Sequence, residues 1–466
     1  MSLQQYFSQQ LEEREAAQAV RLLEAKMAQS RISSELDITR ARHARRRNRR
    51  VDVTSGVPDE ILQLIFVTAK QISWRPVELR VSQVSSHWRN VATHTSELWT
   101  DIEVSVFTPT GSLEAYVTRS GRRPLAITID LWDSTQRLES FQFCSIIRSQ
   151  MFRCRSLEIL SNSSPLEDLY PLLLQLHFEA VPLLESLTIG QVFYNRTRAD
   201  LSPPSILRHL FPNGAPQLTS ARYQGIGMEA CRPPLHNLTT LFIHDVDSPE
   251  RWNYGTFKLF MAEIPRLEYL SVAGDPCNWD YLHNARIDFP SLRALRICYD
   301  DSGEDLPRLW IYANAPRLEI LHIVGGKDWD IVRGYTLLLG RNPFPSLKSL
   351  MMDGCKFNHG TFKILTATFP SIKHLTYRSS DTLFVKALAT SDVWPEIESV
   401  ALWSSSRGLR LGLVQTMLKA RIACRKPIQK LVVANEPPTF PSFFLRDYVR
   451  VECTSPPLTW PEWDPL

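Results

Sequence analysis

The most regular feature of the sequence is a short apolar pattern that recurs through its C-terminal half. Proline is followed by any residue, an apolar residue, two further residues and a second apolar residue. This pattern occurs in eight segments, at 182–187, 216–221, 265–270, 290–295, 316–321, 345–350, 370–375 and 395–400. From Pro265 to Pro395 successive segments begin 25, 26, 29, 25 and 25 residues apart. Such near-constant spacing indicates a structural repeat.

Most of these segments continue with another apolar residue two positions later, which predicts a short β-strand with one buried face. The stretches between them, such as 257–264 and 361–369, carry apolar residues at helical spacing. Related strands without the proline are expected at 157–160, 238–243 and 428–433. We therefore expect an α/β fold of stacked units, because one such unit cannot bury its apolar edge alone.

This spacing resembles the leucine-rich repeat, which implies parallel strands along the concave face of a curved solenoid. The resemblance covers residues 151–436, and it is irregular because the asparagine that recurs in that family is missing. The corresponding positions hold Asp275, Asp300, Gly326, Cys355 and Ser380. We therefore expect a solenoid whose units differ from one another.

One side chain of each predicted strand lies between inward apolar residues and should point to the concave face. These side chains are Thr188, Phe242, Ser271, Arg296, His322, Met351, Thr376 and Ala401. Solenoids bind partners on this face, and aromatic residues, methionine and arginine are enriched at interfaces. The candidates for binding a target protein are therefore Phe242, Arg296, His322 and Met351. The alternative interpretation is an ordinary solvated face with mixed residues.

The N-terminal region, residues 1–50, has a different character. Residues 9–40 lack proline and glycine and are rich in helix-forming residues, which predicts an amphipathic helix. Its apolar positions do not sustain clean heptads, so docking of a single helix and coiled-coil self-association both stay open.

A basic cluster follows at 40–50, with seven arginines and no acidic residue. Its densest part consists of Arg45, Arg46, Arg47, Arg49 and Arg50. A solvated linker and a nuclear-import address are equally favoured interpretations. Nucleic-acid binding is less favoured, because the cluster contains no aromatic residue on which a base could stack.

Residues 54–100 predict three short helices. Pro58 suits the first turn of a helix, and the acidic residues after it favour the positive end of the helix dipole. Apolar residues at helical spacing run from Ile61 to Phe66 and again from Val77 to Trp88. The second run is interrupted at Ser85–Ser86, which predicts a break between two helices.

This segment resembles the F-box. The opening block of that family is matched by Val57-Pro-Asp-Glu-Ile-Leu-Gln-Leu-Ile-Phe66, the central block by Leu79, Val81, Val84, Trp88 and Arg89, and the end by Leu98-Trp99. The departures are mild: Val57 replaces leucine, and Ser85 stands where cysteine is common. The sequence Arg119 to Ile129 is similar to the continuation found in many fungal F-box proteins.

The F-box resemblance implies binding to the Skp-type adaptor subunit of a cullin–RING ubiquitin ligase. The implied adaptor contacts are Val57, Pro58, Ile61, Leu62, Ile65, Phe66, Leu79, Val81 and Val84. The implied core of the bundle is formed by Trp88, Val91, Leu98 and Trp99. For any single residue, a role in the bundle's own core is the competing interpretation.

Composition and charge further limit the classes of protein to which the chain can belong. The chain has 466 residues, of which 44% are hydrophobic and 22% charged, and its formal net charge is +4. Because the cluster at 40–50 alone supplies seven positive charges, the remainder is slightly acidic. No secretory signal, membrane span or metal-binding cysteine pair is expected, and the eight cysteines should be reduced thiols. Glycine is scarce, with 18 residues, and no catalytic or phosphate-binding motif is present.

These features predict a non-catalytic protein without cofactor or metal, in the cytoplasm, the nucleus or both. The expected regions are a helix with a basic linker (1–50), an F-box (54–100), a connecting segment with the first strands (101–150), a solenoid (151–436) and a proline-rich tail or cap (437–466). The favoured function is the substrate receptor of an SCF-type ubiquitin ligase with an unknown target protein. A ubiquitin-independent scaffold is the first alternative, and a nucleic-acid-associated factor is the second.

Overall fold

The computed structural model describes residues 26–29, 31–32, 35–36, 39–40, 42–43, 56–73, 76–105, 107–131, 143–161, 169–191, 209–225, 231–244, 252–279, 286–298, 308–338, 341–378, 382–390, 392–403, 411–434 and 445–454. The chain divides into two compact units, residues 1–99 and 100–466. Each unit is described by itself.

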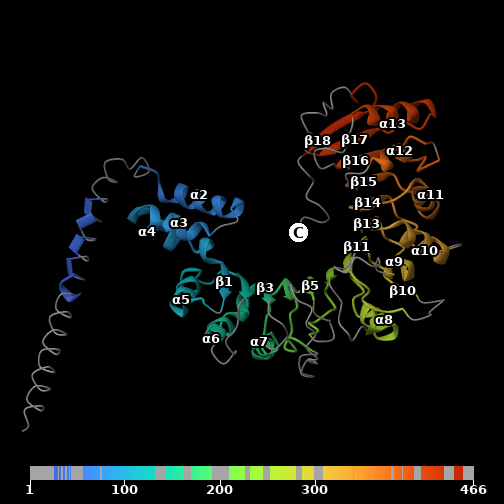
Figure 1. Cartoon of the computed structure of the whole chain (residues 1–466). Coiled ribbons are helices and arrows are strands. Elements are labelled where there is room, and N and C mark those ends of the chain that lie inside the picture. The colour runs from blue at the N-terminus through green and yellow to red at the C-terminus, as the bar shows by residue number, and fades with distance from the viewer. Residues whose placement is uncertain are drawn as a thin grey trace, which may run out of the picture. The chain divides into compact units, whose positions relative to one another are not determined.

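The first unit contains a bundle of three helices and a closing turn (Figure 1). These elements are α2 (Asp59–Ile72), α3 (Val77–Val84), α4 (Ser86–His94) and the 3-10 turn η1 (Ser96–Trp99). Ser85 separates α3 from α4, as the sequence predicts, and its hydroxyl accepts a hydrogen bond from Trp88 N at 3.1 Å. This side-chain cap satisfies one of the first backbone donors of α4.

The core of the bundle forms where α2 and α4 meet the closing turn. Trp99 and Leu98 are fully buried, and Trp99 Nε1 donates to Ala92 O at 2.8 Å. The ring of Phe66 lies 4.9 Å from the partly buried ring of Trp88. A helical bundle of this length has room for only a small apolar core.

Upstream of the bundle, the described residues between 26 and 43 are helical and exposed. Most of the helix expected at 9–40 lies outside the described residues. The same holds for the densest part of the basic cluster, Arg45, Arg46, Arg47, Arg49 and Arg50.

The second unit is built on one large parallel sheet in which each described strand pairs with the next along the chain, apart from short strands set aside. The sheet contains β1 (Asp101–Ser105), β2 (Leu125–Asp130), β3 (Cys154–Ser161), β4 (Ser186–Gln191), β5 (Ser220–Gln224), β6 (Thr240–His244), β8 (Tyr269–Ala273), β11 (Ala294–Cys298), β13 (Ile320–Val324), β14 (Ser349–Asp353), β15 (His374–Arg378), β16 (Ser399–Trp403), β17 (Lys430–Ala434) and β18 (Arg450–Thr454). A strand therefore follows every one of the predicted repeat segments. This order is that of a solenoid-like α/β fold.

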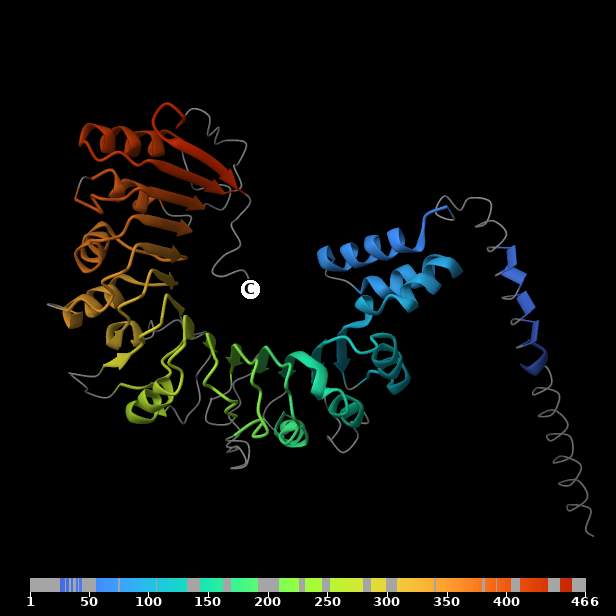
Figure 2. The same ribbon diagram turned by 180° about the vertical axis from the view of Figure 1, so that it is seen from behind.

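Helices join many of these strands, and those labelled in Figure 1 lie on one face of the sheet, as the view from behind in Figure 2 also shows. They are α5 (Thr110–Arg119), α6 (Phe143–Arg148), α7 (Leu169–Leu176), α8 (Tyr254–Ala262), α9 (Leu309–Tyr312), α10 (Asp328–Leu338), α11 (His359–Thr368), α12 (Leu383–Leu388) and α13 (Leu411–Ala423). A 3-10 turn, η3 (Met151–Arg153), precedes β3. The predicted helices at 257–264 and 361–369 correspond to α8 and α11. The opposite face of the sheet is the concave side of this unit.

The recurring proline has a structural reason. In seven of the eight repeats, the carbonyl of the residue before the proline accepts a hydrogen bond from the backbone N–H two residues after the proline, as in Leu184 N to Val181 O at 3.1 Å and Leu347 N to Phe344 O at 3.2 Å. Proline thus occupies the second position of a β-turn, where its fixed φ is favourable. The chain then enters the strand, and Glu268 N donates to Thr239 O of the preceding unit at 2.8 Å.

The sheet is longer than the region 151–436 expected for it. Strands β1 and β2, which fall within 101–150 where first strands are expected, pair in register at the start of this same sheet. At the other end β18, which lies in the segment expected to be a tail or cap, pairs with β17. Short strands β7 (Trp252–Asn253) with β9 (Cys277–Asn278), and β10 (Ile287–Asp288) with β12 (Ala313–Asn314), form two small separate sheets.

Different polar groups stand where a leucine-rich repeat has its recurring asparagine. Asp275 Oδ1 accepts from Trp279 Nε1 at 3.1 Å and from Arg308 N at 2.7 Å. Cys355 is buried, and its thiol donates to Ile323 O at 3.5 Å across neighbouring units. Because each unit uses its own polar group, the loops between strands differ, which accounts for the irregular repeat.

Candidate functional site

The first candidate surface is a stripe of exposed apolar side chains on α2. We call Ile61, Leu64, Ile65 and Ile72 the α2 stripe. These side chains are 47%, 64%, 49% and 83% exposed. Their spacing places them on one side of the helix, about 100° away from the buried residues Leu62 and Phe66. The helix therefore has two adjacent apolar faces, one in the bundle's core and one in solvent.

Helix α3 adds two exposed apolar side chains, Leu79 and Val84. A protein surface normally exposes such residues singly, and a cluster of them marks an interaction site. Among the described residues of the bundle between 56 and 99, the exposed large apolar side chains are those of the α2 stripe with Leu79 and Val84, and upstream of the bundle Met27, Ile32 and Leu36 are also exposed.

The implied adaptor contacts divide into two groups in the structure. Pro58, Ile61, Ile65, Leu79 and Val84 are exposed, and Val57 is partly buried. The other three implied contacts are buried in the bundle: Leu62, Phe66 and Val81. Their burial agrees with the competing interpretation, in which such residues belong to the bundle's own core.

Leu64 and Ile72 extend the exposed surface although they were not among the expected contacts. Helical spacing from Ile61 is the sequence signal that could have found both residues. The implied core residues Val91, Leu98 and Trp99 are buried, and Trp88 is partly buried.

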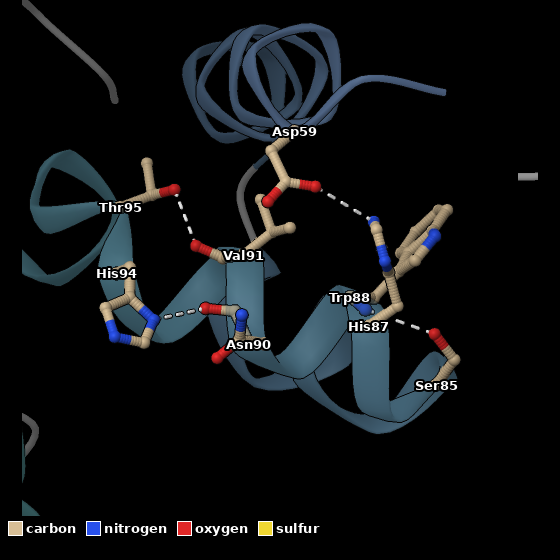
Figure 3. A network of polar contacts seen from close by, with 8 residues as sticks. All are labelled: Asp59, Ser85, His87, Trp88, Asn90, Val91, His94 and Thr95. Atoms are coloured by element: carbon tan, nitrogen blue, oxygen red, sulfur yellow. Dashed lines mark hydrogen bonds and ion pairs between the residues drawn. The ribbon is translucent and has the colours of Figure 1, made fainter. Parts of the chain in front are cut away.

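Polar contacts fix the position of α2 on this bundle (Figure 3). Asp59 Oδ1 at the start of α2 lies 3.2 Å from His87 Nε2 at the start of α4. At the far end of α2, Lys70 Nζ donates to Glu97 O and Leu98 O at 3.0 and 3.1 Å. The α2 stripe is therefore held at both ends of its helix, which reduces the ordering cost of presenting it to a partner.

Within α4, side chains also bond to the helix backbone (Figure 3). His94 Nδ1 lies 2.8 Å from Asn90 O, and Thr95 Oγ1 donates to Val91 O at 2.8 Å. These contacts end α4 next to the closing turn and leave its polar face in solvent.

The second candidate surface is a row of side chains across the concave face. The strand register aligns Thr188, Arg222, Phe242, Ser271, Arg296, His322, Met351, Thr376 and Ala401 at equivalent positions. We call these residues the concave row. The row includes every concave residue expected from the sequence and adds Arg222, which the same alternation rule could have found.

The centre of the concave row is buried rather than solvated. Phe242 is 1% exposed, His322 4% and Arg296 6%, whereas Met351 is partly buried. Phe242 does not belong to the apolar core cluster that contains its strand neighbours Leu241 and Ile243. Its side chain is instead covered by Arg222, whose guanidinium lies 4.3 Å from the ring centroid.

Further polar and charged side chains lie two residues along the strands from the concave row. His244 Nε2 lies 2.9 Å from Ser271 Oγ, and Arg378 Nη1 lies 3.4 Å from Asp353 Oδ2. Burial and the positive charge of Arg296 lower the pKa of His244 and of His322 to about 3. Both imidazoles are therefore neutral at physiological pH, so the charge of this surface comes from its arginines and carboxylates.

A groove of about 770 Å³ lies at the edge of the sheet, beside the turns that precede the strands. Charges of alternating sign line it, including Arg293, which contacts Glu319 at 3.3 Å. Charges of alternating sign continue along this edge, where Lys373 Nζ lies 2.6 Å from Glu398 Oε1. Pairing between successive units gives these groups a structural role.

Two classes of site are not found among the residues that the structure describes. No cluster of three or more histidine, cysteine or acidic residues could hold a metal ion. No helix in the same part of the chain has the length and apolar character needed to cross a membrane. No protein-family profile matches the chain, and no significant match was found among curated proteins.

Proposed function

We propose that the protein is the substrate-recognition subunit of an SCF-type ubiquitin ligase. In this proposal the α2 stripe and the exposed residues of α3 bind a Skp-type adaptor, and the solenoid-like unit binds a target protein. The observation that supports it most is the second apolar face of α2, because a helix of a small bundle has no internal reason to expose Ile61 and Ile65 together.

The mode of binding follows from the chemistry of the surface. An apolar helical face is recognised by burial in a complementary apolar groove, with anchors at helical spacing. Pro58 is the N-cap and Ser73 the C-cap of α2, and the stripe runs from Ile61 near the start of the helix to Ile72, its last residue. Each apolar anchor that becomes fully buried contributes roughly 1.5–3 kcal/mol before the costs of association.

The proposed mechanism requires no bond chemistry from this chain. Tethering a target near a ubiquitin-charged enzyme raises the effective concentration of its lysines, which accelerates transfer without a catalytic residue here. The function is then the product of two binding events on one chain, one with the adaptor and one with the target.

The experiment that tests this proposal compares neighbours of the wild-type chain and of an Ile61→Asp/Leu79→Asp variant by proximity labelling. We expect cullin–RING components only with the wild type, and target proteins with both. Half-lives of those targets should lengthen when the wild type is replaced by the variant. If adaptor capture occurs but no target changes its half-life, the ubiquitin-independent scaffold is favoured instead.

A further inference from the structure

The concave face carries a charge pattern that bears on what it binds. Arginines occur at β5, β11 and β15, as Arg222, Arg296 and Arg378. Each is separated from the next by three steps across the sheet. With neighbouring strands about 4.8 Å apart, these steps correspond to about 14 Å each and about 29 Å in total. Positive charge is therefore spread along the solenoid rather than gathered at a point.

These groups act on each other as one electrostatic cluster. Burial first and Arg296 in addition lower the pKa of Arg222, His244 and His322, and Arg296 opposes the increase that burial causes in the pKa of Asp353. Arg378 also acts to lower the pKa of His322 and of Asp353. A like charge lowers the pKa of a base because it disfavours a second positive charge.

The charge balance of this region is positive. Between β5 and β15, the concave row and the parallel row two residues further along each strand include three arginines and one carboxylate among their described side chains. This carboxylate, Asp353, pairs with Arg378. On the flanking strand β3, Glu158 lies close enough to raise the pKa of Arg222. The first strands of the same face carry acidic residues instead, at Asp101, Glu103 and Asp130. Charge on the concave face is thus segregated along the sheet, although the folded remainder of the chain is slightly acidic.

The three arginines have different roles because their exposure differs. Arg378 is 53% exposed and Arg222 is partly buried, so both can contact a ligand. Arg296 is 6% exposed, and a buried charge is screened much less by salt than an exposed one. Arg296 therefore supplies a field, and the outer arginines supply contacts. The guanidinium of Arg222 is already ordered over Phe242, which lowers the entropy cost of binding.

We propose that the concave face from β5 to β15 binds an extended acidic segment of a target protein. This inference rests on the proposed function, in which the solenoid-like unit holds the target. An extended chain rises about 3.3 Å per residue, so roughly nine residues span the three arginines. The neutral imidazoles of His244 and His322 add no positive charge to this face.

The same observations disfavour a nucleic acid as the occupant. Single-stranded nucleic acids bind to basic grooves that also present aromatic rings for stacking. The aromatic residue of the concave row, Phe242, is buried beneath Arg222 and offers no open ring face. Carboxylates need only the guanidinium groups, which bind them in a bidentate geometry.

The experiment measures binding of a fluorescein-labelled peptide of ten glutamates to the full chain by fluorescence anisotropy. We expect affinity that falls with salt, and no binding of a peptide of ten lysines. Arg222→Gln and Arg378→Gln should each weaken binding about tenfold, the loss expected for a hydrogen bond to a charged group. Arg293→Gln is the matched control, because it removes the same charge from the sheet edge, and it should change affinity less than twofold.

Three results would overturn the inference. They are equal weakening by Arg293→Gln, no binding of the glutamate peptide by the wild type, and tighter binding of a ten-nucleotide thymidine strand than of the peptide. Adaptor affinity measured on the wild type keeps the two proposals apart. A wild type that binds the adaptor but not the glutamate peptide contradicts only the acidic-segment inference, and a wild type that binds the peptide but not the adaptor contradicts only the proposed adaptor interaction.

Discussion

Arg421 on α13 donates a hydrogen bond from Nη1 to the backbone carbonyl of Trp394 at 3.1 Å. The guanidinium is fully buried and also bonds to Leu388 O at 2.7 Å and to Val393 O. Leu388 is the last residue of α12, so one side chain closes the end of that helix and the turn that follows. Burial lowers the pKa of Arg421, yet its bonds to three carbonyls hold the charged group in place.

This contact predicts that Arg421→Met destabilises the solenoid-like unit. Removing the guanidinium leaves three buried carbonyls without their donor, and hydrogen bonds to a charged group each contribute about 1.5–3 kcal/mol. We expect the free energy of unfolding to fall by at least ~3 kcal/mol in urea titrations. Arg425→Met, at an exposed arginine nearby, should leave the unfolding midpoint unchanged. Equal midpoints for the two variants would show that the buried contact is not stabilising.

A second prediction concerns Gly334 within α10. A Cβ atom at this position would lie 2.2 Å from Cη2 and Cζ2 of Trp310, which is buried. Alanine has the higher helix propensity by about 1 kcal/mol, but overpacking against the indole costs roughly 1–3 kcal/mol. We therefore expect Gly334→Ala to lower the thermal unfolding temperature.

Gly412 in α13 provides the matched control for that substitution. A Cβ there meets no atom within 4 Å, so Gly412→Ala should raise the unfolding temperature through helix propensity alone. Combining Gly334→Ala with Trp310→Leu should recover part of the loss, because the clash is removed. Stabilisation by Gly334→Ala alone would contradict the close packing of α10 on Trp310.

A third prediction is a pH dependence of stability caused by the concave histidines. The pKa of His244 and His322 is about 3 in the folded protein, against about 6.5 in an unfolded chain. Between these values the unfolded state binds more protons, so stability falls as the pH is lowered from 6.5. Well below pH 6.5, but above the folded pKa of about 3, each histidine lowers the free energy of unfolding by roughly 1.4 kcal/mol for each pH unit.

Urea unfolding between pH 7 and pH 5 checks this dependence. The midpoint of the wild type should fall more steeply than that of a His244→Gln/His322→Gln variant. The exposed His94 serves as the control, and His94→Gln should retain the steep wild-type slope. Parallel slopes for the wild type and the double variant would mean that these two imidazoles do not titrate as the structure indicates.

The sequence predicts the strands of the sheet well because each repeat combines a turn-favouring proline with alternating apolar residues. Pro265 favours the turn, and the alternating apolar residues after it favour the strand that follows. Neither β1 nor β18 follows a proline repeat: β1 falls in 101–150, where first strands are expected, and β18 falls in the segment expected to be a tail or cap. Local pattern alone does not reveal that these strands pair with the sheet.

The surfaces are harder to predict than the strands. Ile61, Leu62, Ile65 and Phe66 are all apolar on one helix, and only packing against α4 decides that Leu62 and Phe66 turn inward. Alternation places Arg296 and His322 on the concave face, as the structure does, but it gives no sign that they are buried there. Burial depends on neighbouring strands about 25 residues away, which a local pattern cannot include.

The central claim is that the exposed faces of α2 and α3 bind a Skp-type adaptor, and isothermal titration calorimetry of the full chain with such an adaptor tests it most directly. Because truncation of a central interface residue typically costs at least about 2 kcal/mol, Ile61→Asp/Leu79→Asp should weaken binding by at least about 30-fold. Ile422→Asp, at an apolar residue of α13 with similar exposure, is the control and should bind like the wild type. The account predicts tight binding by the wild type and the control, with a large loss in the double variant. Undiminished binding by a folded double variant, or no binding by the wild type, would contradict it.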